Sequence, residues 1–507
     1  MTRRPFPATI AARFAPAALL ALLVSGCVSL APDYDRPALP VPATYAPEDA
    51  GAATPATAAA EIAWRSYFPD PVLQGLISTA LDNNRDLRNA LLRVEEARAL
   101  YGIQRADQFP TIGVQADGSR ARVPGDLNFT GQPQVSSQYQ VGVGMASWEL
   151  DFWGRVRNLK DAALQNYLAS DAAARAATLS LIAEVADSYL SLRELDERLA
   201  LTRETIASRE ESLRIFRRRY EVGSISKLDL TQVETLWQQA KALGADLEQA
   251  RAEQAHALEL LVGAPLDLPR LPPRLDDDAV MRDLPPGLPS ELLVNRPDIV
   301  AAEHRLKASN ANIGAARAAF LPSITLTGAF GTASAELDGL FSGGSRAWNF
   351  APSISLPIFD AGRRSATVDL AEARRDQAVS SYEQTIQVAF KDVSDALSAR
   401  RWLAEQVEVL RATVAAQSER ARLAQLRYDH GASPYLEVLD AQRDLLAAQQ
   451  KLAQTRRALL SSRVRLYAAL GGGTQASLPA QAAAGTTEAS PDNQEPRILR
   501  CACPPEN

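Results

Sequence analysis

The chain has 507 residues, of which 46% are hydrophobic, and its formal net charge is -6. That length accommodates several domains or one extended architecture. The negative balance argues against a nucleic-acid partner, because phosphate binding needs a concentrated basic face and no run of Lys and Arg stands apart from acidic residues. We also predict no metal site, because the histidines are scattered singly in polar stretches where solvated surface positions are expected: His256, His304 and His430.

The N-terminus has the pattern of a secretory signal, with arginines ahead of a short apolar run. That run, residues 15–24, is too brief to span a bilayer as a helix. The sequence "VSGC" follows and resembles a bacterial lipobox, whose cysteine is acylated and becomes the first residue of the mature protein. We therefore predict a signal peptide at residues 1–26 and a covalent lipid on Cys27, the only cofactor expected. The alternative is an ordinary cleavage site with an incidental cysteine.

The rest of the chain reads as two copies of one unit. Tyr428 lies 208 positions after Tyr220 (428 − 220), and Gly431 lies 208 positions after Gly223 (431 − 223). The final residues lack the apolar side chains needed to pack, which predicts disorder around Cys501 and Cys503. The predicted parts after the signal peptide are an extended lipid-anchored segment at 27–69, repeat 1 at 70–270, a linker at 271–289, repeat 2 at 290–473 and a tail at 474–507.

Each repeat contains 66 consecutive residues without proline or glycine, at 155–220 and 363–428. Apolar residues recur there every three or four positions, which predicts an amphipathic helix. At 1.5 Å per residue such a helix is about 100 Å long. Its apolar stripe must be covered by other long helices. The predicted partner helices lie at 70–107, 227–262, 290–319 and 435–470.

Four segments between these helices alternate with period two, which predicts strands. The clearest, at 348–358, places apolar residues on one face and small or polar residues on the other, and three others include Ile112, Tyr139 and Ile324. Strands with an apolar outer face and a polar inner face are typical of outer-membrane barrels. A soluble, half-buried sheet has the same period. Four strands cannot close a barrel, and an open edge in lipid leaves backbone groups unpaired, so a membrane barrel must be shared among chains.

Together these features resemble the TolC-like outer membrane factor family, specifically the lipoprotein branch of the drug-efflux channels. The resemblance covers the chain from Cys27 to about Leu470 and includes Trp64 with the helix after it, the paired Gly-Arg strand-to-helix junctions and both Tyr-x-x-Gly turns. It implies a mainly α fold with a membrane β-barrel part. In this fold three chains form a homotrimer whose twelve strands make one barrel, and a long periplasmic α-helical barrel continues it. Each protomer is then an internal two-fold repeat.

The resemblance also implies partners, a periplasmic adaptor (membrane fusion) protein and an inner-membrane transporter of the RND type, which dock at the helical tips. Each tip is a turn whose glycine supplies the left-handed conformation that ends a long helix. Ser226 and Asp229 are expected to start one following helix as a capping box, and Ser433 with Pro434 at the first helical position is expected to start the other. Helix hairpins without a partner would have the same sequence. The expected adaptor contacts are Gly223, Ser224, Gly431 and Ala432.

A periplasmic gate is implied for the second repeat. In the family, the residues matching Leu436 and Asp440 form rings that narrow the resting tunnel entrance, and the assigned gate here also includes Tyr428 and Arg443. The first repeat has Leu228 and Gln232 at the matching positions, so the carboxylate occurs once per protomer. Without the resemblance, Asp440 and Arg443 are an ordinary i,i+3 surface pair.

The predicted function is that of a passive conduit in the outer membrane, anchored by lipid, that exports drugs or other small toxic compounds. The sequence offers no nucleotide-binding loop, catalytic triad or metal cluster, so we expect no enzyme activity and assign the energy supply to the transporter. The nearest alternative is a conduit for protein export by a type I secretion system. A soluble coiled-coil scaffold and an enzyme are less consistent with the lipobox and the strand alternation.

Overall fold

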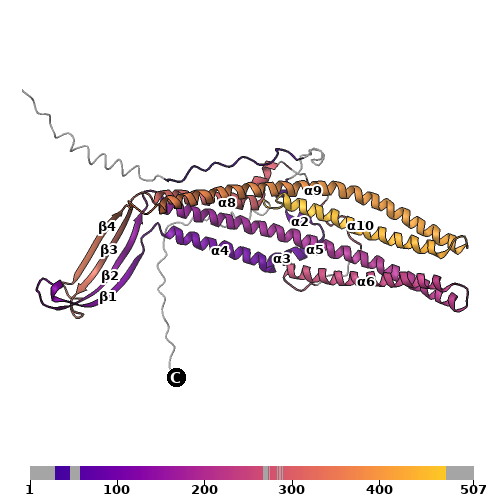
Figure 1. Ribbon diagram of the computed structural model, residues 1–507, viewed down its shortest axis with the longest axis horizontal. Coiled ribbons are helices and arrows are strands. Elements are labelled where there is room, and N and C mark those ends of the chain that lie inside the picture. The colour runs from indigo at the N-terminus through magenta and orange to yellow at the C-terminus, as the bar shows by residue number, and fades with distance from the viewer. Residues whose placement is uncertain are drawn as a thin grey trace, which may run out of the picture.

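The computed structural model describes residues 29–45, 58–266 and 289–475, together with residues 272, 274–281, 284 and 287. The predictions for the signal peptide at 1–26, for Cys27 and for Cys501 and Cys503 lie outside these residues. The protein is long and narrow, with a β-sheet at one end and a bundle of long helices that extends away from it (Figure 1). No helix in the described ranges has both the length and the hydropathy needed to cross a bilayer.

The sheet consists of four antiparallel strands in the order β1-β2-β3-β4, so β1 and β4 each leave one edge unpaired. A bulge interrupts the pairing of β2 with β3 between Met145 and Trp148, where Ser147 has a φ of 45°. Bulges bend a strand and increase its twist, and the sheet is curved along its length (Figure 1). The strands are β1 (Ile112–Val123), β2 (Gln134–Leu150), β3 (Ser323–Ser334) and β4 (Arg346–Ser355).

Paired strands place side chains of the same kind on the same face. Phe330 is opposite both Val143 and Trp348, and all three are apolar. On the other face Gln140 donates to Asp117 across β1 and β2 at 3.3 Å. One expectation was wrong: β4 was expected to run to Ile358, but it ends at Ser355, because the opposing strand begins after a proline and a further proline follows Leu356.

The two long helices were predicted correctly in position and length. They are α5 (Arg155–Glu221) and α9 (Arg363–Asp429), each with 67 residues. Each begins after a glycine in the left-handed region, Gly154 with a φ of 73° and Gly362 with a φ of 87°. The helices that follow them are α6 (Lys227–Val262) and α10 (Tyr435–Ala469).

The two partner helices on the sheet side are broken where single uninterrupted helices were expected. Residues 70–107 form α3 (Pro71–Asn83) and α4 (Arg85–Ala106), because Asn84 is extended and its side chain caps α4 by accepting from the Leu87 amide at 2.8 Å. Residues 290–319 break at Arg296, which precedes a proline and therefore avoids the helical region. The pieces are η3 (Pro289–Glu291), α7 (Leu292–Asn295) and α8 (Pro297–Ala318), and short turns occur as η1 (Ala59–Glu61), α2 (Trp64–Tyr67) and η2 (Gly125–Leu127).

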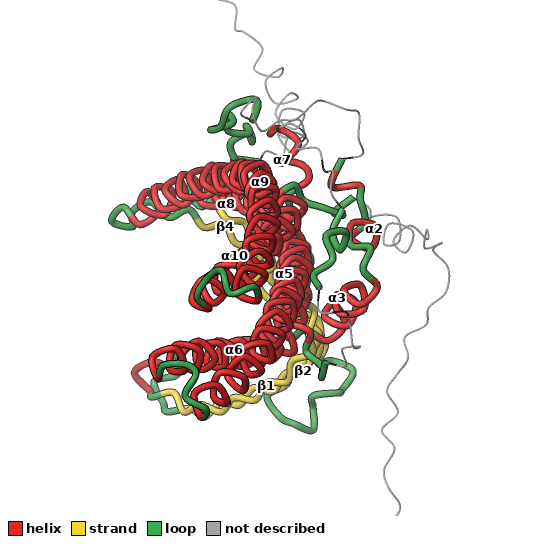
Figure 2. Tube along the Cα trace, turned by 90° about the vertical axis from the view of Figure 1, so that its right-hand side faces the viewer, coloured by secondary structure: helices red, strands yellow, loops and turns green. Residues whose placement is uncertain are grey.

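Helix α5 lies at the centre of the bundle and contacts α3, α4, α6, α8 and α10, whereas α9 packs on α8 and α10. Figure 2 shows these helices as a curved layer with α2, α3 and α7 on its convex side. The main hydrophobic core lies under these short helices, where Tyr67 stacks on Tyr467 at 4.1 Å and both rings are almost fully buried. This core joins the short helix α2 to the C-terminal end of α10.

The segment at residues 29–45, called the strap below, lies along the helices (Figure 1). Ser29 donates to Asn158 at 2.9 Å near the start of α5. Arg36 binds both carboxylate oxygens of Glu303 on α8, at 2.8 and 2.9 Å. The strap is therefore fixed to two helices, and its first described residue lies beside the junction with the sheet.

The expectation of solvated histidines was wrong for His304. Its Nδ1 lies 2.7 Å from Gln165 Oε1, between α8 and α5, and burial lowers the pKa of its ring. The packing of the two helices accounts for this, because position 304 lies on the half-buried side of α8. No cluster of three possible metal ligands occurs in the part of the chain that the structure describes.

The two faces of the sheet should respond differently to charge. We expect Phe350→Arg, on the apolar face in the middle of β4, to cost about 2–4 kcal/mol if that face meets lipid. Asn349→Arg, its neighbour on the polar face, should be tolerated. The measurement is the amount of assembled protein recovered from outer membranes. Equal recovery of the two variants would reverse the assignment of the faces.

Candidate functional site at the helical tips

The two turns at the end of the bundle farthest from the sheet share one backbone conformation (Figure 1). Gly223 has a φ of 78° and Gly431 has a φ of 71°. In the first turn the Gly223 amide donates to the Tyr220 carbonyl at 2.9 Å and the Ser224 amide donates to the Arg219 carbonyl at 2.9 Å. The second turn repeats this pattern 208 residues later, from Gly431 to Tyr428 and from Ala432 to Arg427, at 2.9 and 2.7 Å. Both turns thus satisfy the last carbonyls of a long helix.

The turns differ in how the next helix begins. Ser226 and Asp229 form the predicted capping box, with reciprocal hydrogen bonds of 3.1 Å. The prediction for α10 was wrong: Pro434 is its N-cap rather than its first residue, because a ψ of 152° keeps it outside the helix. The Ser433 hydroxyl has no hydrogen-bond partner in the described residues and so does not cap α10.

The expected contact residues of the tips are exposed. A β-carbon added at Gly223 or Gly431 would meet no atom within 4 Å. Glycine is therefore required at these two positions by the backbone conformation and not by crowding. The surface outside both turns is open, as a docking site requires, and the exposed residues are Gly223, Ser224, Gly431 and Ala432.

Aromatic side chains join the two hairpins just behind the turns. The Tyr435 ring lies 4.4 Å from that of Phe216 and 4.8 Å from that of Tyr428. The Tyr435 hydroxyl donates to Ser212 Oγ at 2.7 Å. Phe216 belongs to a small apolar cluster with Leu213, Val233 and Leu439, against which the two tyrosine rings pack. This packing holds the start of α10 against α5.

A second link joins the end of α9 to α5. The Arg219 guanidinium donates to the Tyr428 hydroxyl and lies 5.8 Å from the centroids of the Phe216 and Tyr428 rings. Tyr428 was assigned to the gate from the sequence, but Arg219 and Tyr435 were not. For Tyr435 a signal exists in the six residues that separate it from Tyr428 across the turn, whereas Arg219 lies in the other repeat and this spacing does not point to it.

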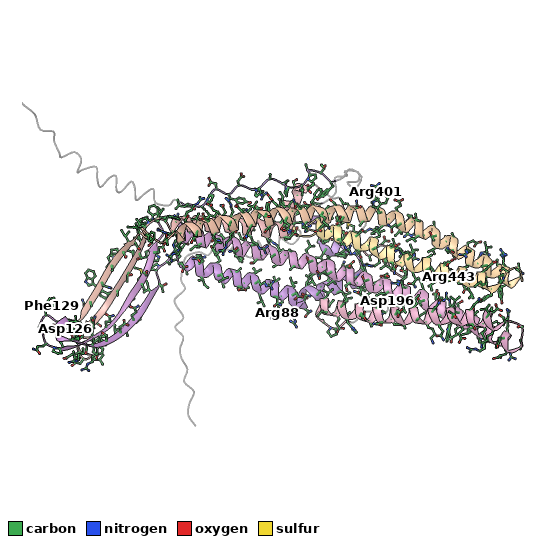
Figure 3. All side chains as sticks on the ribbon, in the orientation of Figure 1. Arg88, Asp126, Phe129, Asp196, Arg401 and Arg443 are labelled. Atoms are coloured by element: carbon green, nitrogen blue, oxygen red, sulfur yellow. The ribbon has the colours of Figure 1, made fainter. Side chains whose placement is uncertain are left out.

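The other assigned gate residues lie in the first three turns of α10. Leu436 is 46% exposed, and Asp440 pairs with Arg443 at 3.1 Å. Arg443, labelled in Figure 3, also pairs with Asp444 at 3.1 Å, and Asp444 pairs with Arg420 of α9 at 2.7 Å. Hydrogen bonds from Arg420 and then Arg443 lower the pKa of the Asp444 carboxyl. Of the three ion pairs that together link α10 to α9, only the pair of Asp440 with Arg443 was predicted from the sequence.

A curved amphipathic sheet with open edges, continued by two long helical hairpins, defines a subunit of an outer-membrane channel. The chain belongs to the outer membrane efflux protein family, whose model matches residues 76–264 and 288–472. It is similar to outer membrane protein OprJ of Pseudomonas aeruginosa, with 46% identity over 468 residues, 91% of this chain and 96% of the relative. The solvent efflux pump outer membrane protein SrpC of Pseudomonas putida is 45% identical over 91% of this chain and 98% of its own.

Solved structures have the same fold. A membrane protein from Pseudomonas aeruginosa matches with a TM-score of 0.83 and 45% identity, covering 88% of this chain and all of its own. The open state of the MtrE outer membrane channel of Neisseria gonorrhoeae matches with a TM-score of 0.81 and 41% identity, covering 89% of this chain and 99% of its own. The mainly helical fold class expected from the sequence is therefore confirmed, as is the family.

The link from Arg219 to Tyr428 should limit opening of the α9 end. Tyr428→Phe removes the hydroxyl that accepts from Arg219 and keeps the ring, so we expect faster amide hydrogen exchange in the last turn of α9, by about tenfold, because a hydrogen bond to a charged group contributes about 1.5–3 kcal/mol. The matched control is Tyr220→Phe in the first repeat, which should leave exchange in α9 unchanged. Unchanged exchange in Tyr428→Phe would show that the ring packing alone holds this end.

Proposed function

We propose that the protein is the outer-membrane channel of a tripartite efflux system, a passive conduit that carries small toxic compounds to the exterior. The observation that carries this proposal is an amphipathic sheet with two unpaired edges at the end of a helical bundle about 100 Å long. Membership of the outer membrane efflux protein family supports it. The relatives named for solvent and toluene efflux support small compounds as the cargo.

The working unit is a homotrimer. The free edges of β1 and β4 require partners in lipid, and strands from three chains would close a twelve-stranded barrel. The helices at the two sides of the protomer also need cover: in α4 only Leu87 is buried, while the part of α9 nearest the sheet exposes Leu370 and Val388. Pairing α4 of one chain with α9 of the next would cover both. Leu91, Leu92, Leu100 and Ile103 are the exposed apolar residues of α4.

The location is the outer membrane, with the helical barrel in the periplasm. A lipid on Cys27 is an additional anchor in this proposal. The strap supports it, because Ser29, two residues after Cys27, is bound to Asn158 beside the sheet. An acyl chain attached there would start at the level of the membrane surface.

The tips are the docking sites for a periplasmic adaptor, which connects the channel to an inner-membrane transporter of the RND type. Their exposed turns and open surroundings support this assignment. Energy for export comes from the transporter in this proposal. The gate consists of Leu436 and Asp440 from three chains at the tunnel entrance, with Tyr428 and Arg443 holding α9 and α10 in the resting position.

The lipid and the barrel should contribute separately to membrane association. Cys27→Ser removes the acyl chains but leaves the strands, so we expect weaker retention in the outer membrane rather than loss of it. The measurement is density-gradient fractionation with quantification of trimer in membrane and periplasmic fractions. Complete release of a folded trimer into the periplasm would contradict the shared barrel.

Removing the proposed constriction should open the channel. Three carboxylates near one axis repel one another and bind cations, and Leu436 narrows the same passage one turn away. We expect the wild-type trimer in a planar bilayer to show low conductance that multivalent cations reduce further. During its openings the double variant Leu436→Ala/Asp440→Ala should show a higher conductance than wild type and lose most of that block, because alanine removes both side chains from the passage and preserves the helix.

The control for this experiment is Gln232→Ala in the first repeat, which matches Asp440 by position (440 − 232 = 208). It should behave like wild type. If the double variant conducts no better than wild type at normal trimer yield, Asp440 is a surface residue and the constriction lies elsewhere.

A further inference from the structure

A buried cation without a counter-ion lies between the two hairpins. Arg209 of α5 is 4% exposed. One of its terminal nitrogens donates to the Leu236 carbonyl of α6 at 2.6 Å, and its Nε has no hydrogen-bond partner. Across the described ranges, no carboxylate forms an ion pair with it.

This arrangement is energetically unfavourable. Burial lowers the pKa of the Arg209 guanidinium, which nevertheless stays charged because arginine does not deprotonate in proteins. An ion removed from water without a partner costs several kcal/mol. The same layer contains another unpaired donor, the indole Nε1 of Trp237, the residue after Leu236. Within the described residues, two buried donor groups at this level therefore lack an acceptor.

The part of α10 that faces Arg209 carries a second cation. Two contacts fix the register of the antiparallel helices: Tyr435 with Ser212, and Leu439 in one cluster with Leu213. One turn farther along α10 is Arg443, and one turn back along α5 is Arg209. The charge of Arg443 lowers the pKa of Arg209 further, as expected for like charges that face each other.

The acceptor that Arg209 lacks is available next to Arg443 on α10: it is the carboxylate of Asp440. Asp440 precedes Arg443 by three residues, so the two side chains differ by about 60° around the axis of α10. In the present structure Asp440 is bound to Arg443 at 3.1 Å and is half-exposed. A modest rotation of α10 about its axis would turn Asp440 toward α5 in place of Arg443, at a level about 4.5 Å nearer the tip, which the long side chain of Arg209 can reach.

We propose that Arg209 is the counter-charge of the open gate: opening rotates α10 so that the Asp440 carboxylate replaces Arg443 beside the buried guanidinium. This inference rests on the proposed function, in which Asp440 lies at the tunnel entrance. In the closed state three carboxylates crowd the axis while each protomer buries an unpaired cation. In the open state the carboxylates leave the axis and each pairs with Arg209. One rotation therefore relieves both unfavourable arrangements.

The test is single-channel recording from purified trimers in planar bilayers. All variants carry Leu436→Ala, so that openings are frequent. We expect Arg209→Met to shorten the mean open dwell time about tenfold, because it removes the charged hydrogen bond that stabilises the open state. Arg209→Lys should keep most of the open dwell time. The matched control is Arg214→Met, which removes an exposed arginine of α5 that pairs with Glu211 of its own helix.

The dependence on Asp440 distinguishes this inference from a general packing effect. Asp440→Asn should shorten the open dwell time by the same factor, and Arg209→Met should add nothing in that background. Equal shortening by Arg209→Met with and without Asp440 would overturn the inference, as would no shortening at all. If Arg209→Met assembles poorly, Asp440→Asn decides the question, because this change at a half-exposed position alters neither side-chain size nor packing, and an unchanged open dwell time overturns the inference.

The proposed gate can fail separately. If the Leu436→Ala parent conducts no better than wild type, the gate is wrong and the role of Arg209 falls with it. If the parent conducts well and Arg209→Met has the same open dwell time as the parent, the gate is retained and only the role of Arg209 as its counter-charge is wrong.

Discussion

A backbone amide or carbonyl that faces hydrocarbon must have a hydrogen-bond partner, and a sheet of four strands leaves two edges without one. This constraint determines the rest of the architecture. In the proposed trimer, chains meet edge to edge through β1 and β4, and the helices that continue from these strands meet their neighbours in the same order. The apolar side chains left exposed on α4 and α9 lie on the two sides where this contact would occur. Interfaces in the sheet and in the helices are thus parts of one surface.

The length of the helical part has its own physical basis. A helix of 67 residues is possible because no proline or glycine interrupts it, and it is stable because other helices cover its apolar stripe along its length. The packing of other helices against this apolar stripe differs along its length. Around Tyr67 and Tyr467 the short helices add a second layer and close a large core, whereas near the tips only small clusters hold the hairpins together. A molecule built in this way is stiff in the middle and can move at the tip.

The sequence alone predicted the elements that depend on local pattern. Both long helices, the position of α6 and the alternating faces of the strands follow from residue spacing, and the capping box at Ser226 follows from local chemistry. The breaks at Asn84 and Arg296 were missed, although a capping side chain and a following proline mark them. The side-chain links at the tips could not be found in this way. Arg219 and Tyr428 lie 209 residues apart, and the burial of Arg209 depends on three helices whose relative register no local pattern specifies.

The shared geometry of the two turns has a consequence for stoichiometry. Backbone hydrogen bonds at Gly223 and Gly431 are the same, but the side chains around them are not, since one turn leads into a capping box and the other into Pro434. In a trimer, a partner that recognises the backbone alone would find six equivalent positions and could bind as six copies of one chain. A partner that recognises the side chains would find two sets of three. The number of adaptor chains per channel therefore reports which of the two kinds of chemistry the partner recognises.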